Sequence, residues 1–115
     1  MVNGITKLKP TYDLSEVQQL VKLGAFDLNF IARKTAKDHF GWKKATVGKA
    51  MLKLKKSRTP RGHFYKSAPR YDNPRVWVDY YKAPNLMGED VYIHFRVEND
   101  RVIICSFKQL DEEEA

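Results

Sequence analysis

The fold is decided by the stretch Asp90-Val-Tyr-Ile-His-Phe-Arg-Val-Glu-Asn-Asp-Arg-Val-Ile-Ile-Cys-Ser-Phe-Lys108. Its two arms are rich in β-branched and aromatic residues, which favour β-strands. Between the arms, Asn99 and Asp100 tolerate the backbone angles of a turn. The stretch therefore predicts a β-hairpin.

The distribution of apolar residues predicts the register of this hairpin. If Tyr92 lies opposite Lys108 and His94 lies opposite Ser106, a wholly apolar set of side chains shares one face, because directly opposed residues point the same way. That set is Val91, Ile93, Phe95, Val97, Ile103, Cys105 and Phe107. A slip of one residue would mix apolar and polar side chains on both faces, so burial disfavours it. This register leaves Asn99 to Arg101 as the connection.

Residues 1–24 predict a lead-in followed by one helix. The lead-in, residues 1–12, has no periodicity, and we expect it to be loosely held. Asp13 and Glu16 form an acidic variant of the capping box, and Gly24 is suited to close the helix in the left-handed conformation. The expected inward-facing residues are Leu14, Val17, Leu20 and Val21.

Two further helices are predicted before the sequence pattern changes. The second begins near Asp27 or Asn29, runs to about His39 and ends at Gly41. The third covers Lys43–Lys56 and carries lysines on its outer surface. The expected inward-facing residues are Phe30, Ile31 and Ala36 in the second helix, and Val47, Ala50, Met51 and Leu54 in the third.

From His63 onward the apolar residues follow the alternation of β-strands. One strand is predicted over His63–Ala68 and another over Arg75–Lys82, with a turn over Pro84–Gly88 before the hairpin. The chain therefore belongs to the α+β class. We expect N-terminal helices packed on one face of an antiparallel sheet of about four strands.

The composition is that of one basic domain. The 115 residues are enough for a single core, and we expect a domain over residues 1–110 followed by an acidic tail over residues 111–115. The net charge of +7 includes the four acids at 111–114, so the remaining residues carry +11. Such an excess favours polyanionic partners, most often nucleic acid. A lysine-rich surface that serves only solubility is the alternative.

The cysteine and histidine residues indicate no metal or redox site. Cys105 is the single cysteine, and its place in an apolar strand indicates a small buried hydrophobe. His39, His63 and His94 are isolated, and no phosphate-loop or Gly-x-Ser-x-Gly motif is present, so we expect no metal and no cofactor. No apolar run reaches membrane-spanning length and no signal-peptide core is visible, so we expect a cytoplasmic protein without a membrane partner.

Lysine, tyrosine, histidine and arginine residues on the strands are the candidates for chemistry. They are His63, Tyr65, Lys66, Tyr92, His94, Arg96 and Lys108. Such groups suit metal-free RNA cleavage, in which a base takes the 2′-hydroxyl proton, cations hold the phosphorane and an acid protonates the leaving 5′ oxygen. Aromatic rings beside them can stack unpaired bases. Taken alone, each such residue is more often a solvated or structural residue.

Several short motifs occur in the order and spacing of a known family. They are Phe64-Tyr65-Lys66-Ser67, Val76-Trp77 with Asp79, Val91-Tyr92 and Ser106-Phe107-Lys108. Together with the helical pattern Leu14-Ser15-x-Val17-x-x-Leu20-Val21-x-x-Gly24, they resemble the MqsR family of bacterial toxins, which are mRNA interferases of the RelE-like ribonuclease fold. The resemblance covers most of the chain, with residues 27–61 poorly matched.

The resemblance implies the toxin of a type II toxin-antitoxin system. Such a toxin is a ribosome-independent endoribonuclease that cuts single-stranded mRNA at short GC-containing sites and is held inactive by a cognate, MqsA-like antitoxin. The family's functional residues carry over to Lys66, Tyr92 and Lys108 as catalytic residues, and Tyr65 matches the adjacent tyrosine as a base-stacking or orienting residue. The chain departs from the family pattern at Val78, where the family has a glutamine.

The remaining candidates have no fixed counterparts in the family. They are His63, His94 and Arg96, and together with Tyr65 we expect them to contact RNA. Two other functions use the same residues. A non-catalytic RNA-binding module would bind RNA without cleaving it, and a toxin-like scaffold would bind a protein through an exposed strand edge and have no RNA affinity.

Overall fold

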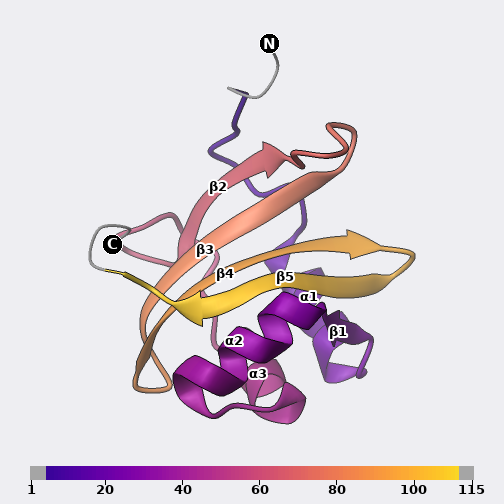
Figure 1. The fold of residues 1–115 in the computed structure, drawn as a ribbon. Coiled ribbons are helices and arrows are strands. Elements are labelled where there is room, and N and C mark those ends of the chain that lie inside the picture. Colours follow the sequence, from indigo (N-terminus) through magenta and orange to yellow (C-terminus); the bar gives the residue numbers. More distant parts are fainter. Residues whose placement is uncertain (1–4, 112–115) are drawn as a thin grey trace.

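The computed structural model describes residues 5–111, which form three helices packed on a five-stranded sheet (Figure 1). The α+β class predicted from the sequence is confirmed. The elements, in chain order, are α1 (Leu14–Lys22), β1 (Phe26–Leu28), α2 (Phe30–Phe40), α3 (Lys44–Met51), β2 (Phe64–Pro69), β3 (Trp77–Leu86), β4 (Glu89–Glu98) and β5 (Arg101–Gln109).

The strand order in the sheet is β1-β5-β4-β3-β2. The pairs among β2, β3, β4 and β5 are antiparallel, as predicted. β1 was not predicted, and it pairs with β5 in parallel, so the sheet is mixed. Three residues between two helices are too short to show a strand periodicity, and Asp27, which we expected near a helix start, lies in β1.

The caps predicted for α1 and α2 are present. The Asp13 carboxylate accepts a hydrogen bond of 2.8 Å from the backbone N–H of Ser15, and Gly24 follows α1 with a φ of 77°. The Asn29 side chain accepts one of 2.8 Å from the N–H of Ala32, and Gly41 ends α2 in the left-handed conformation. Local capping chemistry therefore fixes where both helices begin and end.

The face that α2 buries differs from the prediction. Ala32 and Ala36 are fully buried, whereas Phe30 and Ile31 are 79% and 64% exposed. The prediction that Phe30 and Ile31 face inward is therefore wrong. α2 lies close along β5, since the Thr35 hydroxyl donates a hydrogen bond of 2.7 Å to the carbonyl oxygen of Phe107. Alanine permits this close approach, and larger side chains on that face would prevent it.

α3 is shorter than the predicted Lys43–Lys56 helix. It ends at Met51, and turns of the chain follow it. The predicted inward-facing residues are nevertheless all buried, namely Val47, Ala50, Met51 and Leu54. The last of these lies beyond the helix, so the apolar pattern continued after the helical hydrogen bonds had ended.

The hairpin register is confirmed at its open end and wrong near its turn. Tyr92 lies opposite Lys108 and His94 lies opposite Ser106, but Phe95 lies opposite Ile104 because of a bulge in β5. The connection has two residues, Asn99 and Asp100, with φ angles of 52° and 58°. A two-residue turn of this kind matches the right-handed twist of the strands.

The bulge changes which residues of β5 enter the core. Val102 and Ile104 are buried, and beyond the bulge Phe107 is buried as predicted. The prediction that Ile103 and Cys105 lie on the apolar face is wrong, since both are only partly buried. The extra residue in β5 shifts the alternation, so Val102 and Ile104 face the core before the bulge and Phe107 faces it after the bulge.

Residues 5–12 are held more firmly than the sequence predicted. The backbone N–H groups of Thr11 and Tyr12 donate hydrogen bonds of 3.0 and 2.9 Å to the carboxylate of Asp79, which is fully buried in β3. Lys7 and Ser67 exchange two backbone hydrogen bonds. The segment is therefore fastened across β2 and β3.

Two other predictions concern the C-terminal tail and membrane-spanning helices. Residues 112–115, most of the predicted acidic tail, lie outside the described residues. Among residues 5–111, no helix has the length and apolar character needed to cross a lipid bilayer.

Candidate functional site: a lysine and tyrosine face of the sheet

Strand pairing brings the candidate side chains together in two neighbouring rows. The first row crosses all four antiparallel strands and contains Lys66, Tyr80, His94 and Ser106. The second row contains Lys82, Tyr92 and Lys108. Their strand neighbours on the opposite face, such as Tyr81, Ile93 and Phe107, are fully buried in the core against the helices. The two rows therefore lie on the face of the sheet away from the core, because side chains alternate along a strand.

Three rings form an aromatic cluster at the centre of these rows. The ring centroids of Tyr80 and His94 are 4.7 Å apart, with the planes inclined by 34°. Tyr92 lies 6.3 Å from Tyr80 and 6.0 Å from His94. These separations are within the range of attractive ring contacts. The cluster offers aromatic surface, and unpaired bases stack on such rings in other proteins that bind single strands.

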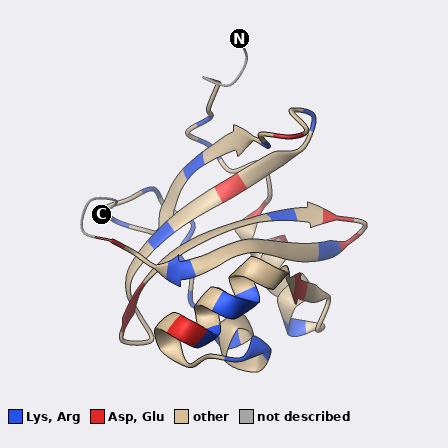
Figure 2. Ribbon diagram, in the orientation of Figure 1, with Lys and Arg blue, Asp and Glu red and all other residues tan. Residues whose placement is uncertain are grey.

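Lysine ammonium groups surround this aromatic cluster. The Nζ atom of Lys66 lies 5.0 Å from the ring centroid of Tyr80, and that of Lys108 lies 5.3 Å from the centroid of Tyr92. Lys82 Nζ lies 3.9 Å from the centroid of Tyr65, a cation-π distance. Figure 2 shows basic residues on β2, β3 and β5. Several positive charges therefore converge on one small surface.

Lys66 and Lys82 form no salt bridge with the acidic residues that the structure describes. Asp79, the acidic residue of β3, lies on the core face and is fully buried. The ammonium groups of Lys66 and Lys82 are therefore available to an anionic ligand such as a phosphate.

His94 is an uncharged imidazole within this cationic cluster. Burial, together with the nearby positive charges of Lys108 and Lys66, lowers the pKa of His94 to about 4. Its Nδ1 atom is buried and has no hydrogen-bond partner among the described residues. At neutral pH His94 therefore adds a polar nitrogen and a ring surface to the site, and no charge.

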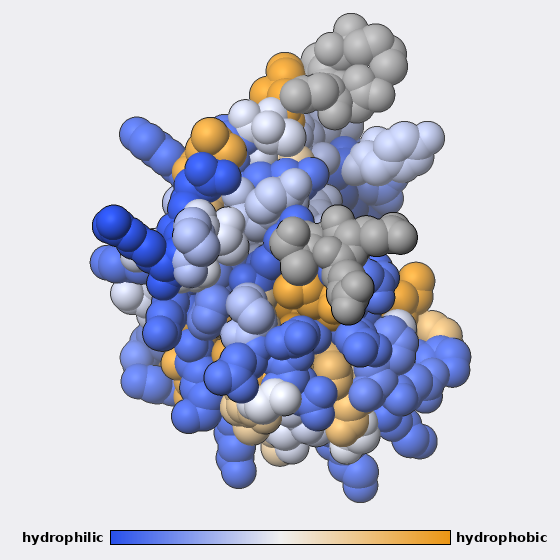
Figure 3. Space-filling view, turned by 90° about the vertical axis from the view of Figure 1, so that its left-hand side faces the viewer, coloured by the Kyte–Doolittle hydropathy of each residue, from blue (hydrophilic) through white to orange (hydrophobic). Residues whose placement is uncertain are grey.

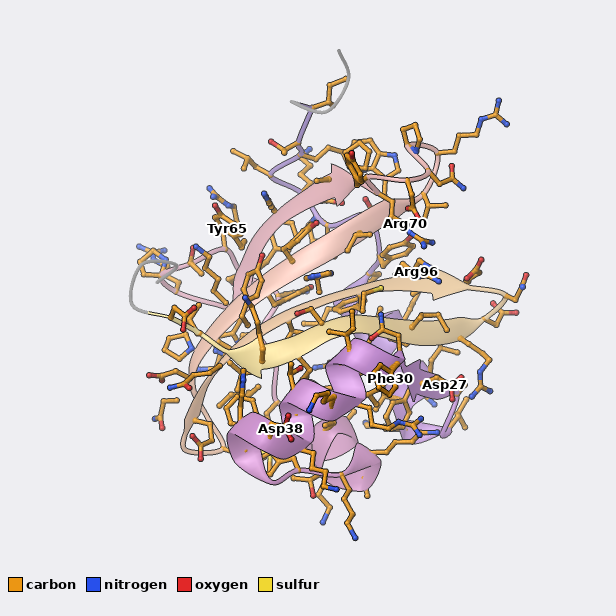
Figure 4. All side chains as sticks on the ribbon, viewed as in Figure 1. Asp27, Phe30, Asp38, Tyr65, Arg70 and Arg96 are labelled. Carbon is orange, nitrogen blue, oxygen red and sulfur yellow. The ribbon has the colours of Figure 1, made fainter. Side chains whose placement is uncertain are left out.

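Arg96 and Cys105 lie beyond His94 on the same face. The Arg96 guanidinium donates a hydrogen bond of 3.1 Å to the Cys105 sulfur and contacts Glu98 at 3.3 Å. Burial raises the pKa of the Cys105 thiol, against the opposing effect of Arg96. Together with Arg70 they line a hollow of about 300 Å³, and Figure 4 shows Arg70 and Arg96 near one end of the sheet. Cys105 therefore belongs to the polar face, contrary to the prediction of a small hydrophobe in the core.

The other two predicted residues lie at the opposite end of the rows. Tyr65 occupies the bulge between Phe64 and Lys66, with its ring 5.5 Å from Lys66 Nζ (Figure 4). His63 precedes β2, and its Nδ1 accepts a hydrogen bond of 3.0 Å from the backbone N–H of Lys55. Burial, with the charge of Lys55, lowers the pKa of His63. The structure brings Tyr65 to the lysines, whereas His63 fastens the preceding loop.

Two residues of the site were not singled out from the sequence. They are Tyr80, which lies between Lys66 and His94, and Lys82, which lies opposite Tyr92. Burial raises the pKa of Tyr80, so its hydroxyl is protonated at neutral pH. The signal was present in the alternation of Val78, Tyr80 and Lys82 along the strand, since these residues share one face. Without knowing which face β3 turns to the core, the sequence did not separate them from Asp79 and Tyr81.

Within the described residues, no group of three or more His, Cys, Asp or Glu side chains is arranged to hold a metal ion.

Comparison with known proteins identifies the family. No curated protein matches the chain. Residues 9–109 match the family described as motility quorum-sensing regulator, toxin of MqsA. This match includes every element of the fold and both rows of the site, so the chain belongs to the MqsR toxin family and is the toxin of a toxin-antitoxin system.

Proposed function

We propose that this protein is an endoribonuclease that cleaves single-stranded mRNA without a metal ion. The observation that carries the proposal is the cluster of lysine ammonium groups around Tyr80, Tyr92 and His94. Positive charge next to partly exposed aromatic rings suits a flexible polyanion with unpaired bases. The lysines also provide the positive charge that a phosphoryl-transfer reaction needs as negative charge develops.

The reaction is a transfer of the phosphoryl group within the RNA. A base removes the proton from a ribose 2′-hydroxyl, the 2′ oxygen attacks the adjacent phosphorus, and the bond from phosphorus to the 5′ oxygen breaks as an acid protonates that oxygen. The products are a 2′,3′-cyclic phosphate and a free 5′-hydroxyl. We assign Lys66 as base or phosphate stabiliser, and Tyr92 and Lys108 as phosphate and proton-transfer groups.

Neighbouring residues position the RNA for this reaction. Tyr65 and Tyr80 offer ring faces for bases, and the uncharged His94 offers a ring edge at neutral pH. Arg96 extends the positive surface toward a further phosphate. His63 supports the loop before β2, and we assign it no direct contact with RNA.

The family membership supports a regulated activity in the cell. The family is described as the toxin of MqsA, so we propose that a cognate, MqsA-like antitoxin holds the ribonuclease inactive. The substrate is cytoplasmic mRNA, and we propose that the protein acts there. The domain over residues 1–110 is the active unit in this proposal.

Cleavage of a synthetic single-stranded RNA in excess chelator tests the proposed function. We expect new fragments that end in a 2′,3′-cyclic phosphate, and no cleavage when the nucleotide at the cut site carries a 2′-deoxyribose. Tight RNA binding without any fragments would instead identify a non-catalytic RNA-binding module. Cleavage only after addition of a divalent metal would refute the metal-free mechanism.

A further inference from the structure

A second hollow lies beside the lysine and tyrosine face, at the end of the sheet where β2 begins and β5 ends. Its volume is about 350 Å³. Most of the surface at this end of the molecule is hydrophilic, with small hydrophobic patches (Figure 3). The residues that line the hollow are Thr59, Pro60, Gly62, Tyr65, Lys82, Pro84 and Leu110.

One wall of the hollow is a loop fixed by backbone hydrogen bonds. The N–H of Thr59 donates to the carbonyl oxygen of Phe64 at 3.0 Å, and the N–H of Phe64 donates to that of Ser57 at 3.1 Å. Gly62 packs so closely that a Cβ at this position would collide with the carbonyl group of Ser57. The wall is therefore formed before any ligand binds, which lowers the entropic cost of binding.

The lining favours a flat, mostly apolar ligand with a negative charge attached. Pro60, Pro84, Leu110 and Tyr65 make most of the lining apolar, and Thr59 is the small polar residue in it. Lys82 supplies the single positive charge in the lining. Sites that hold drug-sized molecules measure about 300–1,000 Å³, so this volume suits one ring system with a short substituent.

Lys82 and Tyr65 connect this hollow to the proposed reaction site. Lys82 lies opposite Tyr92, which in turn lies opposite Lys108. The ammonium groups of Lys66 and Lys82 lie 5.5 and 3.9 Å from the centroid of the Tyr65 ring. A nucleotide whose phosphate is held by these lysines would therefore have the hollow within reach of its base.

We propose that this hollow is a nucleobase subsite, which binds the base of one nucleotide flanking the cleaved phosphate. The base would lie against Pro84 and Pro60, with a polar edge toward Thr59 and its phosphate toward Lys82. This inference rests on the proposed ribonuclease function and adds a site at which the enzyme recognises one base of its RNA substrate. Pro84 is exposed in the protein alone, so it is free to receive a base.

The test is a scan of abasic sites in a short RNA that contains the mapped cleavage sequence and a 2′-deoxyribose at the cut position. Each nucleotide in turn loses its base, and affinity is measured by fluorescence anisotropy. For the wild-type protein we expect one position next to the cut where base removal weakens binding by about tenfold, the scale of one stacked base. In Pro84→Ala we expect the penalty at that position alone to shrink.

Pro74→Ala is the matched control, because Pro74 is also an exposed proline but lies in the loop before β3. Its abasic profile should equal that of the wild type. A wild-type profile without a preferred flanking position, or the same penalty in Pro84→Ala, would overturn the subsite while leaving RNA cleavage intact. Absence of cleavage of the parent RNA by the wild type would refute the proposed function, and the subsite with it.

Discussion

Protonation of His94 is unfavourable in the folded protein, both because the ring is partly buried and because Lys66 and Lys108 are positively charged. Burial and the charges of Lys108 and Lys66 lower its pKa from 6.5 to about 4. Protonation would place a further positive charge in a partly buried site that already holds several. The folded protein therefore favours the neutral ring, whereas in the unfolded chain His94 binds a proton with its ordinary pKa of 6.5.

The depressed pKa predicts a loss of stability in acid that His94 causes. The free energy of unfolding is not reduced by His94 above about pH 6.5. It falls as the pH drops toward 4, because only the unfolded chain then binds the proton readily. We expect the loss to reach about 3 kcal/mol at pH 4. Urea unfolding of the wild type and of His94→Gln at several pH values measures it. Parallel pH profiles for the two proteins would contradict the assignment.

At the scale of elements, the open half of the β4 and β5 hairpin positions the proposed chemistry. Tyr92 and Lys108 lie opposite each other there, with the Lys108 Nζ atom 5.3 Å from the Tyr92 ring centroid. If both contact the same phosphate, Tyr92→Phe and Lys108→Ala should each lower the cleavage rate, and their effects should couple in a double-mutant cycle. Strictly additive effects would show that the two groups serve separate steps or sites.

The other face of the same hairpin contributes stability. Phe95 is fully buried and stacks on Tyr81 with ring centroids 5.4 Å apart. Phe95→Ala should therefore lower the free energy of unfolding by about 3–5 kcal/mol. Phe30→Ala is the matched control, because Phe30 is 79% exposed, and its effect should stay within about 0.5 kcal/mol. Equal denaturation midpoints for the Phe95→Ala variant and its parent would refute this packing.

The same hairpin shows what the sequence predicts and what it does not. Apolar alternation placed Tyr92 opposite Lys108 correctly, because a one-residue slip there would bury polar groups. It did not predict the bulge at Cys105, since two short apolar runs on either side of a bulge look like one continuous strand. Tyr80 was missed for a similar reason, since its place in the site depends on pairing with β2 and β4.

In the helices, too, local features were predicted from the sequence and tertiary contacts were not. Caps at Asp13, Asn29 and Gly41 are local and were predicted from neighbouring residues. The inward face of α2 depends instead on how closely the helix approaches β5, and that distance belongs to the tertiary structure. The sequence therefore predicted the bounds of α1 and α2 well, but it made α3 too long and placed Phe30 and Ile31 on the wrong face.

At the scale of the whole molecule, a basic chain should bind RNA with a marked dependence on salt. The net charge is +7, and the described structure gathers Lys66, Lys82 and Lys108 on one face. Binding of a single strand releases counter-ions, so the logarithm of affinity should fall linearly with that of salt concentration. Lys82→Ala should make this slope shallower by about 0.7, the share of one phosphate contact. An affinity that is equal in low and high salt would rule out this mode of binding.

The central claim is that the lysine and tyrosine face cleaves RNA, and the cleavage rate of Lys66→Ala tests it most directly. Lys49→Ala is the matched control, because Lys49 is an exposed lysine on α3 outside both rows. With RNA in excess chelator, we expect Lys66→Ala to cleave at least about a hundredfold more slowly than the wild type, with an unchanged unfolding midpoint, and Lys49→Ala to cleave at the wild-type rate. A folded Lys66→Ala protein that cleaves as fast as the wild type would contradict the account.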